Sequence, residues 1–157
     1  MTRLPRFGTA LTAATVACLA LTGLAPARAV APQSATITAD CDRFGRVAGT
    51  LTATQSGTSA TLTLRAPGIK APIGLARDSV ASTLTLTRAG GGTVAFTGRR
   101  NAAAARGAAV TIGPLTGRVA RGDRLEAYGG SLRMTLFGIT LTCRAAGRQA
   151  PGPFVFA

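Results

Sequence analysis

Apolar and polar side chains alternate in short runs from residue 35 onward, and Thr occupies many of the polar positions. A period of two is typical of strands that have one buried and one exposed face. Thr suits such strands because its branched side chain packs well on a pleated surface. The runs cover residues 35–39, 47–54, 59–65, 82–88, 93–99, 108–112, 115–120 and 131–144. The chain is therefore predicted to consist of short antiparallel strands.

Residues typical of turns separate these runs. The segments Gln55-Ser56-Gly57-Thr58 and Ala89-Gly90-Gly91-Gly92 predict hairpin turns, and Ala66-Pro67-Gly68 ends a further run. Residues 102–105 are too few for a stable helix, so a loop is expected there. Turns about every 8–12 residues are typical of all-β sandwiches and barrels. We predict one antiparallel β-sandwich, with a small β-barrel as the alternative.

The apolar residues of the last run change parity midway, from Leu132, Met134 and Leu136 to Ile139, Leu141 and Cys143. Because the side-chain period of a strand is two, the buried face must change at Phe137-Gly138. We expect either a β-bulge at Gly138 or a strand that crosses between sheets. A tight hairpin at Gly138 is disfavoured, since the turn has too few residues.

The first 29 residues have the three parts of a secretory signal peptide. Arg3 and Arg6 precede an apolar stretch over residues 7–24, and Ala27-Arg28-Ala29 suits signal peptidase. Thr15-Val16-Ala17-Cys18 faintly resembles a lipoprotein lipobox, but the residues that follow stay apolar, so lipidation of Cys18 is disfavoured. No later segment has about 18 consecutive apolar residues, so no transmembrane span is predicted. We expect a secreted protein, either extracellular or associated with the cell envelope.

After the signal peptide (1–29), we expect a flexible leader (30–34), the β domain (35–144) and a C-terminal tail (145–157). The apolar end of the tail, Phe154-Val155-Phe156, is expected to pack onto the domain. Two cysteines remain after export to an oxidising compartment, and a Cys41–Cys143 disulfide is predicted. It would close a loop of about 100 residues and stabilise the fold by up to roughly 4–5 kcal/mol.

The composition argues against catalysis and metal binding. The chain has no His, which excludes a Ser-His-Asp triad, a Cys-His pair and an imidazole metal ligand. Asp40 and Asp42 offer too few oxygens for calcium, and local pairing with nearby arginines is expected instead. Asp123 and Glu126 are a poor glycosidase pair, because the chain has no Trp for a sugar platform. No enzyme activity, metal site or cofactor is predicted, although a hydrolase with an unseen nucleophile and base is the remaining enzymatic hypothesis. Lys70, the single lysine, lies in no motif of a Ser-Lys nucleophile.

The strongest functional indication is charge. The chain has 18 Lys and Arg against 5 Asp and Glu, a net charge of +13, which becomes +10 without the three arginines of residues 1–29. The anion-binding candidates are Arg99, Arg100, Arg118, Arg121, Arg124 and Arg133. Arginine grips phosphate and carboxylate groups, so the expected partner is an anionic cell-wall polymer or a phospholipid surface. A specific nucleic-acid ligand is disfavoured, because aromatic residues for base stacking are few.

Two simpler explanations stand beside these functional ones. A solvated, arginine-rich surface produced by biased composition also accounts for the charge, because Ala, Gly and Thr are inflated too. Arg121-Gly122-Asp123 resembles the tripeptide of integrin-binding loops, but a tight turn with Gly at its centre is the favoured explanation. Nothing in the sequence indicates an oligomeric state.

The early Cys41 and the terminal run Leu136-Phe137-Gly138-Ile139-Thr140-Leu141-Thr142-Cys143, after a signal peptide, resemble small secreted immunoglobulin-like domains of high-GC actinobacteria. This resemblance implies an immunoglobulin-like sandwich of unknown function. The chain is also loosely similar to neocarzinostatin-type chromophore carriers, which implies an apolar cleft for a small molecule. Unlike those carriers, it is basic and lacks a second pair of cysteines outside the signal peptide. We expect a non-enzymatic module that binds an anionic partner, with a small-molecule carrier or inhibitor as the alternative.

Overall fold

The computed structural model describes residues 30–157, so the predicted signal peptide and Cys18 lie outside the described residues. These residues form nine strands: β1 (Ser34–Cys41), β2 (Gly45–Ser56), β3 (Ser59–Lys70), β4 (Ala81–Arg88), β5 (Thr93–Arg99), β6 (Ala109–Arg118), β7 (Arg124–Leu136), β8 (Ile139–Ala145) and β9 (Phe154–Val155). Within residues 30–157 no helix is long and apolar enough to cross a membrane. The prediction of an all-β chain is confirmed.

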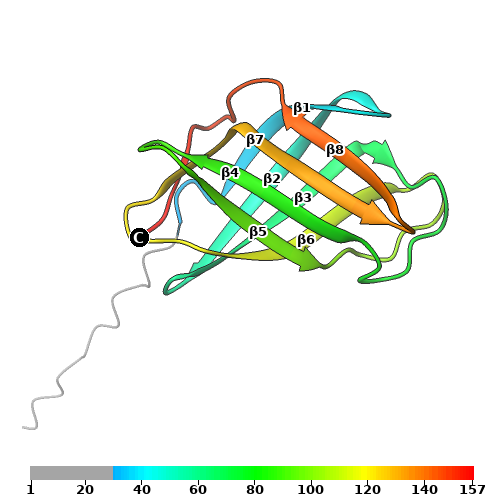
Figure 1. Cartoon of the computed structure of the whole chain (residues 1–157), viewed down its shortest axis with the longest axis horizontal. Helices are drawn as coiled ribbons and strands as arrows, with labels where there is room; N and C mark the ends of the chain where they lie inside the picture. The colour runs from blue at the N-terminus through cyan, green and yellow to red at the C-terminus, as the bar shows by residue number, and fades with distance from the viewer. Residues whose placement is uncertain (1–29) are drawn as a thin grey trace, which may run out of the picture.

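The strands close into an eight-stranded antiparallel β-barrel (Figure 1). The order around the barrel is β4-β5-β6-β3-β2-β1-β8-β7, and pairing of β7 with β4 completes the circle, with Leu84 opposite Leu132. The predicted sandwich is therefore wrong, and the alternative, a small barrel, is correct. Alternation shows which side chains are buried, but both architectures bury one face of every strand. A barrel differs from a sandwich because its two edge strands pair with each other, and the alternation of residues does not show whether they do.

Side chains from every barrel strand fill the middle of the interior. Leu51, Leu62, Leu86, Phe96 and Leu115 are among the most deeply buried residues. A barrel of eight strands is just wide enough for its interior to be filled by side chains or to hold one small ligand. The outer wall is polar, and Thr residues of neighbouring strands face each other across it. Thr54 Oγ1, for example, lies 2.7 Å from Thr61 Oγ1.

Residues 109–118, predicted as parts of two strands, form the single strand β6. Its buried parity changes between Ile112 and Leu115, because β6 has one more residue than β3 over this stretch. Such a bulge moves the side chains that follow it to the opposite parity. Gly113 has a φ of +114°, and a Cβ there would lie 2.6 Å from the Leu62 carbonyl oxygen, so glycine is required at the bulge.

The segment around Gly138 is a tight hairpin, so the prediction of a bulge or a sheet crossing is wrong. Leu136 is opposite Ile139, which leaves Phe137 and Gly138 as a two-residue turn with φ values of 49° and 77°. Positive φ at both central residues is the requirement of a type I′ turn, whose twist matches that of the flanking strands. Two residues are therefore enough. The change of parity arises because paired residues across a hairpin face the same side.

The two terminal segments close one end of the barrel, called the closed end below. Phe154 and Phe156 are buried, and β9 pairs with β7. The Gln55 side chain bonds both the backbone N–H and the carbonyl oxygen of Ala157. The expectation that Phe154-Val155-Phe156 packs onto the domain is confirmed. Residues 30–34, predicted as a flexible leader, are part of the fold. Val30 is buried, and Ala31 forms a bridge with Val155.

The predicted disulfide is present. Cys41 and Cys143 face each other on β1 and β8, and the bond joins positions 102 residues apart. It links the first strand to the last strand of the barrel on the wall that both share. A disulfide fits an oxidising compartment, as the cysteine count suggested.

Candidate ligand-binding site

The end of the barrel opposite the terminal segments, called the open end below, contains an apolar pocket with a volume of about 370 Å³. Its floor and inner wall are buried side chains of the barrel and of the β3–β4 connection: Ile69, Leu75, Val80, Val110, Ile112 and Met134. Its rim is formed by Arg43, Phe44, Pro72, Ile73, Phe137 and Ile139, and Leu136, Thr140 and Leu141 complete the wall. Small-molecule sites have volumes of about 300–1,000 Å³ and mostly apolar linings. The pocket is therefore large enough for a small ligand.

Two long connections hold one side of the pocket in place. Residues 71–80 join β3 to β4, and residues 100–108 join β5 to β6. Leu75 and Ala104 exchange backbone hydrogen bonds of 2.7 and 3.0 Å. The buried Asn101 side chain accepts a hydrogen bond from the Val80 N–H and donates one to the Ala76 carbonyl oxygen. These bonds satisfy the backbone of an irregular segment, so this wall of the pocket is preformed.

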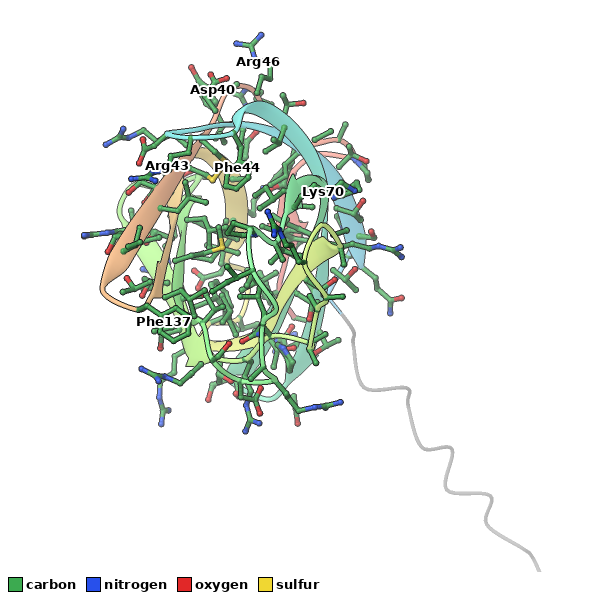
Figure 2. The ribbon with its side chains drawn as sticks, turned by 90° about the vertical axis from the view of Figure 1, so that its right-hand side faces the viewer. Asp40, Arg43, Phe44, Arg46, Lys70 and Phe137 are labelled. Carbon is green, nitrogen blue, oxygen red and sulfur yellow. A yellow bond between two sulfur atoms is a disulfide. The ribbon has the colours of Figure 1, made fainter. Side chains whose placement is uncertain are left out.

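The rim exposes four apolar side chains, three of them at or beside tight turns and one on the β3–β4 connection. Phe137 at the tip of the β7–β8 hairpin is 79% exposed, and Ile139 beside it is 59% exposed. Phe44, on the β1–β2 turn, is 36% exposed, and Ile73 is 46% exposed. Figure 2 looks toward this end and shows Phe44 and Phe137 on different sides of it. Four of the five large apolar side chains exposed in residues 30–157 thus lie at the open end.

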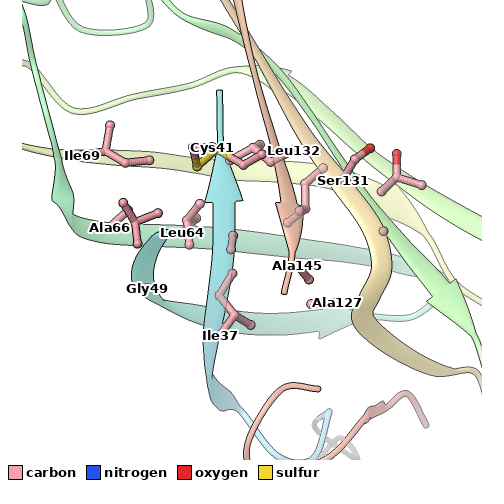
Figure 3. A pocket seen from close by; sticks show the side chains of 16 residues that line it. Ile37, Cys41, Gly49, Leu64, Ala66, Ile69, Ala127, Ser131, Leu132 and Ala145 are labelled. Atoms are coloured by element: carbon pink, nitrogen blue, oxygen red, sulfur yellow. A yellow bond between two sulfur atoms is a disulfide. The ribbon is translucent and has the colours of Figure 1, made fainter. Parts of the chain in front are cut away.

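A second, much smaller cavity lies deeper in the barrel, beside the disulfide (Figure 3). Its volume of about 30 Å³ is room for a water molecule or two and not for a ligand. Small residues such as Gly49, Ala66 and Ala127 leave this space. Ile69 lines both the cavity and the pocket, so its side chain marks the boundary between them. The barrel interior is therefore filled below the pocket.

The polar side chains of the pocket lining are Arg43 and Thr140. Arg43 is exposed on the β1–β2 turn, next to Phe44. Lys70, at the end of β3, also lies at this end of the barrel (Figure 2). A guanidinium at the edge of an apolar pocket favours a ligand with an apolar body and an anionic group.

The structure divides the six predicted anion-binding arginines among separate places. Arg99 and Arg100 lie where β5 ends, at the open end. Arg118, Arg121 and Arg124 lie around the β6–β7 connection, at the closed end. Arg133 is on the outer wall, between Thr83 of β4 and Thr142 of β8. The six arginines therefore do not form one patch.

The acidic residues mostly make ion pairs within the chain. Asp40 pairs with Arg46, which is one of the local pairs expected from the sequence, and Glu126 pairs with Arg148. Asp42 accepts a hydrogen bond from the Thr142 N–H. Among residues 30–157 no three Cys, Asp or Glu side chains gather as a metal site would require.

The Arg121-Gly122-Asp123 segment is a turn whose carboxylate is used inside the protein. Asp123 accepts two hydrogen bonds from Arg88, at 3.1 and 3.3 Å, and one from the Ala120 N–H at 2.8 Å. Burial by itself raises the pKa of Asp123, but the Ala120 N–H and the Arg88 guanidinium outweigh this and hold the pKa below its usual range. An adhesive loop presents its carboxylate to a partner, and this one is only 12% exposed. The geometry therefore favours the turn explanation.

The pocket was not predictable from the sequence, because its lining comes from five separate segments. Phe44 and Phe137 each precede a glycine, and the structure places both in tight turns, where polar residues are usual. An exposed Phe at a turn has no use in a barrel core and indicates a contact surface. A scan against protein-family models, a search of curated proteins and a search of solved structures gave no match.

Proposed function

We propose that the protein is a non-enzymatic carrier that binds one small amphipathic molecule in the pocket at the open end of the barrel. The observation that carries the proposal is a preformed apolar pocket of about 370 Å³ with a single guanidinium at its edge. The ligand has an apolar body and an anionic group, since burial of apolar surface supplies affinity and Arg43 supplies orientation. This is the small-molecule hypothesis of the sequence analysis, with the site moved from a cleft between sheets to a barrel mouth.

Two dyes test this proposal, the anionic 8-anilinonaphthalene-1-sulfonate and the neutral N-phenyl-1-naphthylamine. We expect both dyes to bind with a rise in fluorescence. This binding should be lost in Val110→Phe, because the larger side chain fills the pocket floor. Val119→Phe is the matched control, because Val119 is a similarly buried valine near the closed end. Arg43→Gln is expected to weaken the anionic dye about fivefold and leave the neutral dye unchanged.

Thermal denaturation shows whether each variant is folded. Because Val110→Phe crowds the core, Ile73→Trp provides a second block at the partly exposed rim. Equal dye binding by the wild type, Val110→Phe and Ile73→Trp would exclude the pocket as the site. Equal loss in Val119→Phe would show that the dyes report loosened packing instead.

Adsorption to anionic envelope polymers is a second candidate function, favoured by the distribution of charge. Residues 30–157 carry 15 Lys and Arg, and ion pairs involve only Arg46, Arg88, Arg100 and Arg148. Because the others lie at both ends and on the wall, attraction to a polyanion would have no fixed orientation. We expect retention on immobilised heparin that falls with ionic strength. Elution at low salt would exclude this function.

A further inference from the structure

We infer that the open end of the barrel binds the surface of an anionic lipid bilayer, with the β7–β8 hairpin tip inserted among the lipids. The inference goes beyond the carrier function, because it requires no ligand in the pocket. It also differs from polymer adsorption, because it names a lipid surface and assigns the contact to one end of the barrel. Three observations carry it: the backbone of Phe137, the grouping of exposed apolar side chains, and the charge around them.

Phe137 occupies a position where the fold favours another residue. Its φ of 49° is in the left-handed region, which Gly, Asn and Asp adopt far more readily than an aromatic residue. Its side chain is 79% exposed, so packing inside the protein does not offset this strain. A residue that breaks a local rule without a gain in the fold indicates a role outside it. At a hairpin tip, that role is contact with another surface.

The neighbours of Phe137 extend this contact into an apolar rim. Ile139, Ile73 and Phe44 are the other exposed apolar side chains of the open end. They surround the pocket mouth, so their exposed surface is continuous with the apolar pocket wall. Tyr128, the fifth large exposed apolar residue of residues 30–157, lies on β7 far along the strand from the hairpin. The open end is therefore the part of the barrel surface that is suited to transfer from water into an apolar layer.

The charge around this rim matches an anionic surface. The exposed cations of the open end are Arg43, Lys70, Arg77, Arg99, Arg100 and Arg106, and its acids are Asp42 and Asp78, which gives a net charge of +4 beside the neutral Asp40–Arg46 pair. Aromatic and aliphatic side chains enter the boundary between headgroups and acyl chains, while Lys and Arg attract anionic headgroups. The closed end is also cationic, but Phe154 and Phe156 are buried there. Charge and exposed apolar surface coincide at the open end.

Cosedimentation of the full chain with phosphatidylglycerol-containing vesicles, and with vesicles of phosphatidylcholine alone, tests the inference. We expect binding to the anionic vesicles only, decreasing with salt. Phe137→Asn is expected to weaken this binding about tenfold and to keep or raise the melting temperature, since Asn accepts the turn conformation. Tyr128→Ser is the matched control, because it removes an exposed aromatic ring from β7, away from the hairpin tip. Every variant retains residues 1–29, so differences between variants do not come from that segment.

Each other outcome has a defined meaning. Equal vesicle binding by Phe137→Asn and the wild type, or equal binding to both vesicle types, would overturn the inference. Retention on heparin without vesicle binding would also overturn it and leave polymer adsorption as the function. A wild-type dimer that Phe137→Asn converts to a monomer, without vesicle binding, would assign the rim to a second copy of the chain. Dye binding in the pocket is scored separately, so failure of the carrier proposal leaves this test intact.

Discussion

Loss of the Cys41–Cys143 bond is expected to lower the free energy of unfolding by about 4–5 kcal/mol. The bond joins residues 102 positions apart, so it removes much of the conformational entropy of the unfolded chain. β1 and β8 also pair through Ala39 opposite Ala145 and Asp40 opposite Arg144, so we expect the native barrel to keep this pairing without the bond. The destabilisation therefore comes mainly from the unfolded state and not from a lost native contact.

Urea denaturation of the oxidised and the reduced wild-type protein measures this effect with the same side chains in both samples. The double variant Cys41→Ala/Cys143→Ala, measured with and without reductant, is the control for effects of the reductant itself. Its stability should match that of the reduced wild type within the cost of removing two buried sulfur atoms. A difference below about 1 kcal/mol between oxidised and reduced wild type would contradict the entropic account.

Truncation of Phe154 to Ala is expected to destabilise the protein by about 3–5 kcal/mol. Its ring is fully buried at the closed end, and β9 is only two residues long. Leu125 pairs with Phe154 across the sheet, and the Phe156 N–H bonds the Asp123 carbonyl oxygen. Loss of the ring would leave a cavity at the closed end, although Phe156 and the backbone bonds of Val155 with Ala31 still hold the C-terminal segment.

Thermal denaturation measures this second effect, which should lower the melting temperature by about 10–20 °C. Val155→Ala is the matched control, because Val155 is on the same short strand but only partly buried. We expect it to cost much less than Phe154→Ala. Equal and small effects of the two substitutions would show that the tail is not part of the core.

Most strands were predictable because Thr and aliphatic residues alternate along them. Residues 66–70 of β3 and 124–130 of β7 lack this Thr pattern and were not among the predicted runs. The closure of the barrel was not, since pairing of Leu84 with Leu132 joins strands far apart in the chain. At Gly138 the change of parity was seen, but its cause was misassigned. A two-residue turn requires positive φ at both central positions, and Phe in that place hid the signal that Asn-Gly would have given.

The candidate site, like the closure of the barrel, was not predictable from local sequence patterns. Charge was the functional feature predicted from the sequence, but the fold disperses the candidate arginines, with Arg99 and Arg121 at opposite ends of the barrel. The pocket depends on Phe44, Ile73 and Val110, which come from different connections and strands. Tertiary structure alone brings such residues together, so no local periodicity encodes them. The sequence contains Phe137 before Gly138, and the structure shows that this Phe is exposed at a turn.

The central claim is that the open-end pocket binds an apolar molecule with an anionic group. Its most direct test is a nuclear magnetic resonance titration of the isotope-labelled protein with dodecanoate. We predict saturable changes of the amide signals of Phe44, Ile73 and Phe137 around the pocket, with the closed-end residues Phe154 and Phe156 unchanged. Signals that stay constant throughout the titration, or that change only around the closed end, would contradict the claim.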